Sequence, residues 1–229
     1  MEKFGTKYGG WYIPKDILLD ENSVVYSAGV GEDISFDLYL SDKYNCNILL
    51  IDPTIRAIKH YNEIIKYYKN KKWNFSGNIQ KDYKEKIEKL CPNLNKITYI
   101  EKGLWKNNSK MKFYKQTNPK YVSQSLKKEM FGNEFYEVDV ISIKNLMLDN
   151  NDTKIDLLKI DIEGAEIEVI DKMLDDKIYP IYLCIEFDLL LKKKDVKNKT
   201  NELLDKLQYN GYTILINDNN NITFKLNDI

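Results

Sequence analysis

The apolar residues of this chain fall into short runs, and stretches with helical periodicity separate them. Runs that are apolar on both faces predict strands buried inside a sheet. These runs span residues 23–30, 47–52, 155–161 and 181–187. Further strands are predicted at residues 97–104, 110–115, 136–141, 212–217 and 222–226.

Helices are predicted between the strands, where apolar residues recur every three to four positions. The predicted helices cover residues 32–44, 53–69, 162–174 and 199–209, with a shorter one at 81–90. Pro53 stands at the start of the second of them, where proline is well tolerated. The segment 69–96 is rich in Lys, Asn and Tyr and predicts a surface excursion.

The alternation of buried strands and helices predicts an α/β fold, with one open and mostly parallel sheet and helices on both faces. Asn219 and Asn220 favour a tight turn between the last two strands, so the C-terminal edge of the sheet is expected to be antiparallel. We find no linker and no internal repeat, and we expect residues 1–229 to form a single domain. Within the N-terminal segment 1–22, residues 11–12 could form a lid over the ligand crevice.

In such sheets ligands bind at the carboxyl ends of the strands, where the strand order reverses. After the first strand, Gly29 and Gly31 permit a tight turn and a close ligand approach. Asp52 ends the second strand and can accept both hydrogen bonds of a ribose diol. Ile34 replaces the third glycine of the dinucleotide fingerprint, so the pattern indicates a nucleoside ligand other than nicotinamide or flavin dinucleotides. The simpler alternatives are a plain strand–helix turn and a helix N-cap at Asp52.

Charged residues gather where the fourth predicted strand meets its helix. They are Lys159, Asp161, Glu163 and Glu166. The helix dipole explains part of this pattern, because acids stabilise a helix N-terminus. Glu186 ends the next strand, and a buried carboxylate is costly unless it is paired. We therefore expect these acids to face the ligand crevice.

The composition of the chain limits the kinds of partner that it can be expected to bind. The chain has 35 basic and 35 acidic residues and therefore zero net charge, which argues against a general nucleic-acid or anionic-membrane binder. Arg56 is its one arginine, so guanidinium groups for bidentate phosphate binding are almost absent. The three cysteines form no CxxC pair and indicate a reducing compartment. With no apolar run long enough to span a bilayer and no signal-peptide pattern, we expect a cytoplasmic protein.

The residues at the strand ends resemble those of the FkbM-type methyltransferases, which are class I S-adenosylmethionine-dependent O-methyltransferases, many of them acting on sugars or natural products. The resemblance is carried by residues 25–36, 51–54 and 157–166, with lesser matches at 121–126 and 185–187. It implies a Rossmann-like class I methyltransferase sheet. Two residues depart from the pattern. Ser27 stands where many class I enzymes have an acid, and Asp188 stands where a histidine is expected.

The resemblance also implies roles for individual residues. Gly29 and Gly31 would pass beneath the methionine part of the cofactor, and Asp52 would bind its ribose. The implied cofactor-binding residues are Ser27, Ala28, Gly29, Gly31, Asp33, Asp52, Pro53, Thr54, Gly103, Leu104 and Asp161. Of these, Gly103 and Leu104 would lie near the adenine. The implied substrate-binding residues are Ser123, Ser125 and Asp188.

Methyl transfer to a hydroxyl needs an in-line approach and a base. Asp161 is the first candidate for the base, followed by Glu163 and Glu186. Lys159 would position these acids, or it packs along the sheet with its head in solvent. The same acids could hold a divalent cation, which prefers oxygen ligands, but we assign no metal ligand. His60, the only histidine, is expected on an outer helix face and is not assigned a catalytic role.

The sequence therefore predicts an O-methyltransferase that uses S-adenosylmethionine to methylate a hydroxyl of a sugar or glycan, with no membrane partner. Methylation of RNA or its cap is an alternative, which the lysines of residues 66–89 favour and the zero net charge disfavours. A non-catalytic module that keeps the nucleoside pocket as a scaffold is a second alternative. The oligomeric state and the hydroxyl that is methylated stay open.

Overall fold

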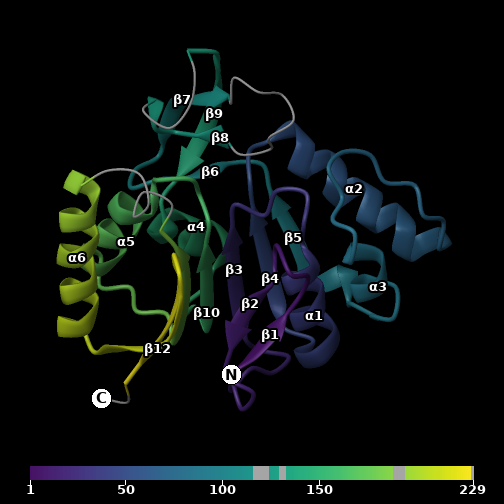
Figure 1. Ribbon diagram of the computed structural model, residues 1–229, viewed down its shortest axis with the longest axis horizontal. Helices are drawn as coiled ribbons and strands as arrows, with labels where there is room; N and C mark the ends of the chain where they lie inside the picture. The colour runs from purple at the N-terminus through teal and green to yellow at the C-terminus, as the bar shows by residue number, and fades with distance from the viewer. Residues whose placement is uncertain (116–123, 129–132, 188–193, 228–229) are drawn as a thin grey trace.

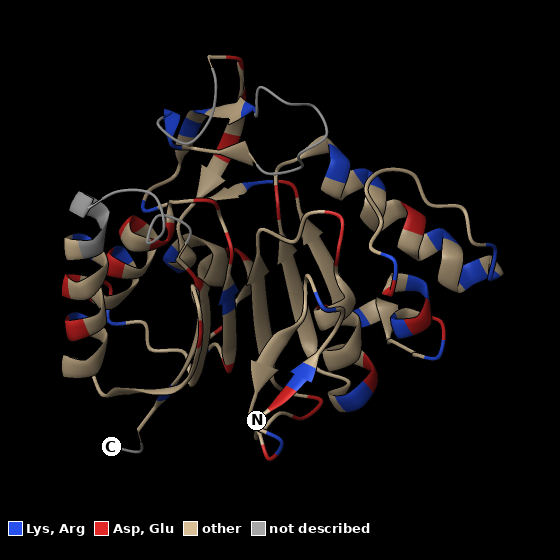
Figure 2. Ribbon diagram, viewed as in Figure 1, with Lys and Arg blue, Asp and Glu red and all other residues tan. Residues whose placement is uncertain are grey.

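The structure is a computed structural model that describes residues 1–115, 124–128, 133–187 and 194–227, with only the backbone described at 194–197. Helices enclose a central sheet, and a smaller sheet stands at the end of the central strands (Figure 1). Charged residues gather on the helices and loops, whereas the central strands carry few of them (Figure 2). None of the helices described is long and apolar enough to cross a lipid bilayer.

Seven strands form the central sheet in the order β12-β13-β11-β10-β3-β4-β5. They are β3 (Val24–Ala28), β4 (Asn47–Ile51), β5 (Ile97–Ile100), β10 (Leu157–Ile160), β11 (Tyr182–Glu186), β12 (Tyr212–Asp218) and β13 (Asn221–Leu226). The first five are mutually parallel, and β13 is antiparallel to both β11 and β12. This arrangement confirms the predicted sheet with its antiparallel C-terminal edge. The strand order reverses between β3 and β10, so a ligand site is expected at their carboxyl ends.

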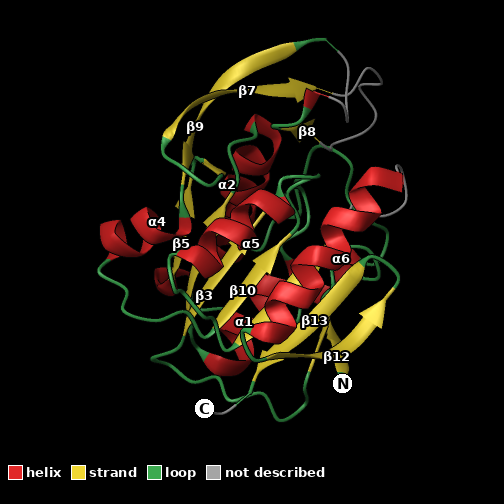
Figure 3. Cartoon of the chain, turned by 90° about the vertical axis from the view of Figure 1, so that its left-hand side faces the viewer, coloured by secondary structure: helices red, strands yellow, loops and turns green. Residues whose placement is uncertain are grey.

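Helices cover both faces of this sheet, as predicted. One face is covered by α1 (Ser35–Tyr44), α2 (Ile55–Asn70), α3 (Tyr83–Ile87) and the antiparallel pair β1 (Glu2–Phe4) and β2 (Trp11–Ile13). The other face is covered by α4 (Ile143–Asn150), α5 (Glu166–Asp175) and α6 (Lys194–Tyr209). Figure 3 shows α5 and α6 lying across the strands. Val25 packs into the first core and Tyr26 into the second, which explains why the central strands are apolar on both faces.

A second sheet has the strand order β6-β9-β7-β8. It comprises β6 (Gly103–Leu104), β7 (Ser109–Lys115), β8 (Gln124–Ser125) and β9 (Phe135–Ile141), packed around a small core. The prediction of one strand over residues 97–104 is wrong. The chain leaves the central sheet after Ile100 and enters the second sheet at Gly103.

Several helices begin later than predicted, and two of these differences concern segments that border the cavity described below. Thr54 is the N-cap of α2 and accepts a hydrogen bond from the Ala57 N–H at 3.3 Å, so Pro53 precedes the helix. Helix α5 begins at Glu166 and not at residue 162, because Glu163 and Gly164 have φ angles of 54° and 96°. These left-handed conformations cannot belong to a right-handed helix.

The segment 69–96 combines surface with core. It contains α3 and the 3-10 turn η1 (Leu94–Lys96), and the side chain of Tyr83 is fully buried in the first core. The expectation that His60 lies on an outer face is wrong, because this side chain is only 1% exposed. Its Nε2 lies 2.7 Å from the Tyr83 hydroxyl, and burial lowers the pKa of His60 to about 4. His60 is therefore a neutral core residue.

Candidate active site

A cavity of about 550 Å³ lies at the carboxyl ends of the parallel strands, where the strand order reverses. This volume is typical of sites for small molecules and cofactors. The predicted site residues that line it are Gly29, Gly31, Asp33, Asp52, Pro53, Thr54, Gly103, Leu104, Lys159, Asp161, Glu163 and Glu186. The fold thus brings together the carboxyl ends of four parallel strands, β3, β4, β10 and β11, and strand β6 of the second sheet around one cavity.

Other predicted site residues lie away from the cavity wall. Ser27 and Ala28 are fully buried in β3 and are not lining residues. Ser125 is also fully buried, and its hydroxyl donates to the backbone oxygen of Glu163 at 2.5 Å. Ser125 therefore stabilises the acidic loop, residues 161–166, and its hydroxyl does not face the cavity. Ser123 and Asp188 lie outside the described residues.

The two glycines after β3 have different structural roles. Gly29 has a φ of 71°, and a Cβ atom placed on it would lie 1.6 Å from the backbone oxygen of Asp161. Position 29 therefore requires glycine, because the ends of β3 and β10 pack too closely there to admit a side chain. Gly31 also has a positive φ, of 54°, but a Cβ atom there would meet nothing within 4 Å. Gly31 thus borders open space in the cavity, where a ligand can approach the backbone.

Asp52 is 5% exposed, and each of its carboxylate oxygens is fixed by one backbone N–H. Oδ2 accepts from Gly31 N at 3.0 Å, and Oδ1 accepts from Thr54 N at 2.8 Å. Burial raises the pKa of Asp52, and these hydrogen bonds oppose the shift. Each oxygen keeps a second lone pair for a ligand hydroxyl, as a ribose diol requires. The helix N-cap is Thr54, so the N-cap alternative for Asp52 is wrong.

An apolar wall faces the cavity beside Asp52. It is formed by Ile51, Pro53, Gly103, Leu104, Phe113 and Leu126. A Cβ atom on Gly103 would lie 3.2 Å from Val140 and 3.7 Å from Pro53, so any side chain there would crowd this wall. A flat ring fits such a surface better than a branched group does.

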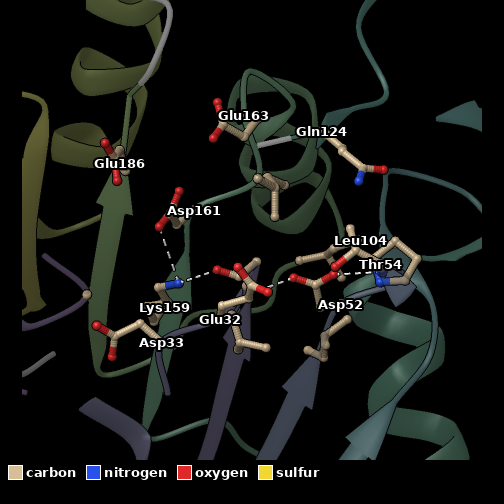
Figure 4. A pocket seen from close by; sticks show the side chains of 18 of the residues that line it. Glu32, Asp33, Asp52, Thr54, Leu104, Gln124, Lys159, Asp161, Glu163 and Glu186 are labelled. Atoms are coloured by element: carbon tan, nitrogen blue, oxygen red, sulfur yellow. Dashed lines mark hydrogen bonds and ion pairs between the residues drawn. The ribbon is translucent and has the colours of Figure 1, made fainter. Parts of the chain in front are cut away.

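Lys159 connects the glycine turn, residues 29–31, to the acidic loop (Figure 4). Its ammonium donates to the backbone oxygens of Ala28 at 3.2 Å and Gly29 at 2.7 Å. It also pairs with Asp161 Oδ2 at 3.5 Å. Because Lys159 is only 6% exposed, the alternative with its head in solvent is wrong.

Three carboxylates, Asp161, Glu163 and Glu186, lie at one end of the cavity, whereas Asp52 lies at the other (Figure 4). Burial and the nearby charge of Asp161 raise the pKa of Glu186 to about 7, while Lys159 opposes the shift. The Asn220 amide donates to Glu186 Oε1 at 2.8 Å. Glu186 can therefore gain or lose a proton near neutral pH. Among the residues described, no three His, Cys, Asp or Glu side chains are grouped so that they could hold a metal ion.

The loop that carries Asp161 is held by Glu166, which is 1% exposed. Its Oε1 accepts from the backbone N–H groups of Ile162 at 3.2 Å and Gly164 at 2.9 Å. These bonds stabilise the left-handed turn at Glu163 and Gly164. Burial raises the pKa of Glu166 to about 8.

Replacement of Glu166 by glutamine should increase stability relative to the wild type progressively as the pH rises from about 4.5 to about 8. In this window the folded protein keeps the carboxyl protonated whereas the unfolded chain releases the proton, so the folding free energy of the wild type becomes less favourable. Urea denaturation at both ends of the window measures the change. A stability difference between the two proteins that is independent of pH would contradict the assignment.

Several residues that line the cavity were not predicted from the sequence. They are Lys7, Tyr8, Gly9, Glu32, Asn78, Gln80, Phe113, Gln124, Leu126 and Asn221. Glu32 is bound by Arg56 through Nε at 3.1 Å and Nη2 at 2.6 Å, and it accepts from Asn78 N at 3.0 Å. The single arginine therefore fixes one wall of the cavity. The position of Glu32 directly after Gly31 was a usable signal, but no sequence pattern marks Asn78 or Gln80.

Comparison with known proteins gives one family. Residues 18–214 match the model of the methyltransferase FkbM domain. No curated protein matches the sequence.

Solved structures with similar chains include the following three. The fibrillarin pre-rRNA processing protein of Methanococcus jannaschii is 12% identical over 90% of this chain and 66% of that one, with a TM-score of 0.42. The precorrin-6y C5,15-methyltransferase of Geobacter metallireducens is 13% identical over 91% and 84%, with a TM-score of 0.43. TYW2 of M. jannaschii in complex with AdoMet is 11% identical over 92% and 72%, with a TM-score of 0.36.

Proposed function

The chain belongs to the methyltransferase FkbM domain family, and on this basis we propose that it transfers a methyl group from S-adenosylmethionine to a hydroxyl oxygen of a sugar or glycan. The methyltransferase class and the cofactor follow from the family. The proposal of an O-methyl acceptor is carried by one observation. Asp161, Glu163 and Glu186 lie at one end of the cavity, where buried Lys159 pairs with Asp161, and a nucleoside-like subsite lies at the other end.

The residues of the cavity fit the cofactor. Asp52 presents two fixed carboxylate oxygens to the ribose hydroxyls, and the apolar wall at Gly103 and Leu104 would contact the adenine. The open space at Gly31 leaves room for the methionine part. S-adenosylmethionine, when bound, supplies an electrophilic methyl group on a cationic sulfonium. The carboxylates of Asp161, Glu163 and Glu186 would balance that positive charge.

Asp161 is the residue that we assign as the base. Its side chain is 31% exposed, so it reaches into the cavity while Lys159 orients Oδ2 at 3.5 Å. Asp161 would accept the hydroxyl proton as the oxygen attacks the methyl carbon in line. Glu186 would act beside it, and Glu163 is the remaining candidate.

The wild-type kcat/KM for the acceptor should rise with pH through about 7, and Glu186→Gln should remove this dependence. The ionised form of Glu186 can accept a hydrogen bond from the acceptor hydroxyl beside Asp161, whereas the protonated form cannot accept its proton. Initial rates measured from pH 5.5 to 8.5 in both proteins give the comparison. An identical acidic limb in both profiles would exclude Glu186 from the titration.

The charge of the site favours a neutral acceptor over a polyanion. The end of the cavity that would bind the acceptor, called the acceptor end, carries the carboxylates of Asp161, Glu163 and Glu186 and one buried lysine. The negative potential of these three carboxylates repels phosphate. The one arginine is already bound to Glu32. An uncharged, hydroxyl-rich sugar is therefore a more favourable acceptor for this site than RNA is. Salt-sensitive retention of the protein on RNA would instead favour the RNA alternative.

Two measurements test the proposal. Calorimetry with S-adenosylhomocysteine should detect binding, and no binding at millimolar ligand would contradict a cofactor site. A screen of oligosaccharides and simple glycosides, with amines and RNA as comparison substrates, should then detect S-adenosylhomocysteine release with at least one of the sugars. If cofactor binding is intact and only amines or RNA are methylated, the sugar assignment fails.

A further inference from the structure

The loop between β1 and β2 is fastened to the site by Thr6. The Thr6 hydroxyl donates to Asp33 Oδ2 at 2.5 Å, and its backbone N–H donates to Ser35 Oγ at 2.9 Å. In turn, Gly9 N donates to the Thr6 hydroxyl at 2.9 Å, and Gly10 N donates to the Thr6 backbone oxygen at 3.1 Å. The loop is therefore closed on itself and anchored to the start of α1.

The apex of this loop is held from a second direction. Lys7 N donates to Asp82 Oδ2 at 3.0 Å, just before α3. Gly9 packs against Asp33, since a Cβ atom on Gly9 would lie 2.6 Å from the carboxyl carbon. Tyr8 stands between these two fixed residues and lines the cavity, yet it is 63% exposed. A large aromatic side chain is thus kept partly in water by a tightly held backbone.

The hydroxyl of Tyr8 lies in the field of the acceptor-end carboxylates. Partial burial, followed by the charges of Asp161, Glu163 and Glu186, raises the pKa of Tyr8 to about 12. The phenol therefore stays protonated at neutral pH. The other exposed tyrosines among the residues that the structure describes lack this setting. Tyr209 is 92% exposed at the end of α6 and does not line the cavity.

We propose that Tyr8 is the platform on which the acceptor stacks, with the apolar face of a sugar ring against the phenol and a ring hydroxyl turned toward Asp161. This inference rests on the proposed function. A tyrosine on a fixed loop offers a large contact area at a small cost in conformational entropy. A pyranose has an apolar C–H face for the ring and equatorial hydroxyls for the carboxylates. Tyr8 would select the acceptor, while Asp161 would act on it.

The test compares Tyr8→Ala, Tyr8→Phe and the control Tyr209→Ala. The probes are methyl glucoside, methyl galactoside and methyl mannoside, each added to full-length protein saturated with S-adenosylhomocysteine. Saturation-transfer NMR should show contacts from the C–H protons of at least one glycoside in the wild type. Tyr8→Ala should weaken its binding about tenfold, which corresponds to about 1.4 kcal/mol. Tyr8→Phe and Tyr209→Ala should bind it about as well as the wild type.

The outcomes of this experiment distinguish a failure of the role proposed for Tyr8 from a failure of the proposed sugar acceptor. Equal glycoside binding by Tyr8→Ala and the wild type would overturn the role of Tyr8 and leave the proposed function standing. An equal loss in Tyr8→Phe would also overturn it, because the hydroxyl rather than the ring would then make the contact. If the wild type binds S-adenosylhomocysteine but none of the glycosides, the sugar acceptor itself is contradicted. S-adenosylhomocysteine affinity, measured for every variant, excludes a loss caused by misfolding.

Discussion

Replacement of Asp161 by asparagine should lower kcat about 10²–10⁴-fold, the usual contribution of a general base. The change keeps the shape of the side chain and removes its charge, so the hydroxyl proton loses its acceptor. The backbone oxygen of Asp161, which packs against Gly29, is unaffected. Binding of S-adenosylhomocysteine should therefore change much less than kcat. Single-turnover rates and calorimetry on the same preparation separate the two effects.

A matched control for this variant is Asp171→Asn. Asp171 also pairs with a lysine, Lys206, but it lies on the outside of α5 and away from the cavity. Its replacement should leave kcat unchanged. If Asp161→Asn retains more than a tenth of the wild-type kcat, Asp161 is not the base. The same assay on Glu163→Gln and Glu186→Gln would then identify which carboxylate is.

Replacement of Gly29 by alanine should destabilise the fold by about 4 kcal/mol or more, a large share of the 5–15 kcal/mol typical of a domain. Two costs add. A non-glycine residue in the left-handed region costs about 1–2 kcal/mol. The new Cβ atom would also lie 1.6 Å from a backbone oxygen, which no rotamer change can relieve. The ends of β3 and β10 would have to separate, breaking the bond from Asp161 N to Ala28 O at 3.1 Å.

Gly31→Ala is the control for Gly29→Ala. Its φ of 54° imposes a similar backbone cost of about 1–2 kcal/mol, but its Cβ atom would enter open space. This protein should fold and should bind S-adenosylhomocysteine more weakly, because the methyl group occupies the cavity. Urea denaturation compares the stabilities of the two variants. Equal losses of stability would mean that the contact between Gly29 and Asp161 is not what requires a glycine.

The parallel sheet explains why so much of the candidate site could be predicted. Gly31, Asp52, Asp161 and Glu186 each stand just after a buried strand or at its last residue. The carboxyl ends of parallel strands meet at one edge, so residues marked by local patterns were expected to converge. Their grouping around one cavity agrees with that expectation. The chemistry assigned to them stays a proposal.

Other predictions failed because they depended on packing between distant segments. Ser125 was expected at the substrate, but its hydroxyl is turned onto the backbone of Glu163. His60 was placed on the surface because its helix pattern does not show that the segment carrying Tyr83 folds over it. No periodicity in the N-terminal segment marks Tyr8, whose position comes from hydrogen bonds between Thr6, Asp33 and Ser35.

Local sequence patterns were sufficient to predict the fold class and the strand ends, because hydrophobic periodicity and glycine or acidic residues after a strand are local signals. The contacts made at those strand ends depend on the tertiary structure. It buried Lys159 beneath the glycine turn, turned Glu163 into a left-handed conformation and placed the β1–β2 loop beside the acids. Each of these depends on atoms that lie far apart in the chain and meet only when the core is packed. Local sequence patterns cannot encode such contacts, since many partners satisfy the same pattern of apolar positions.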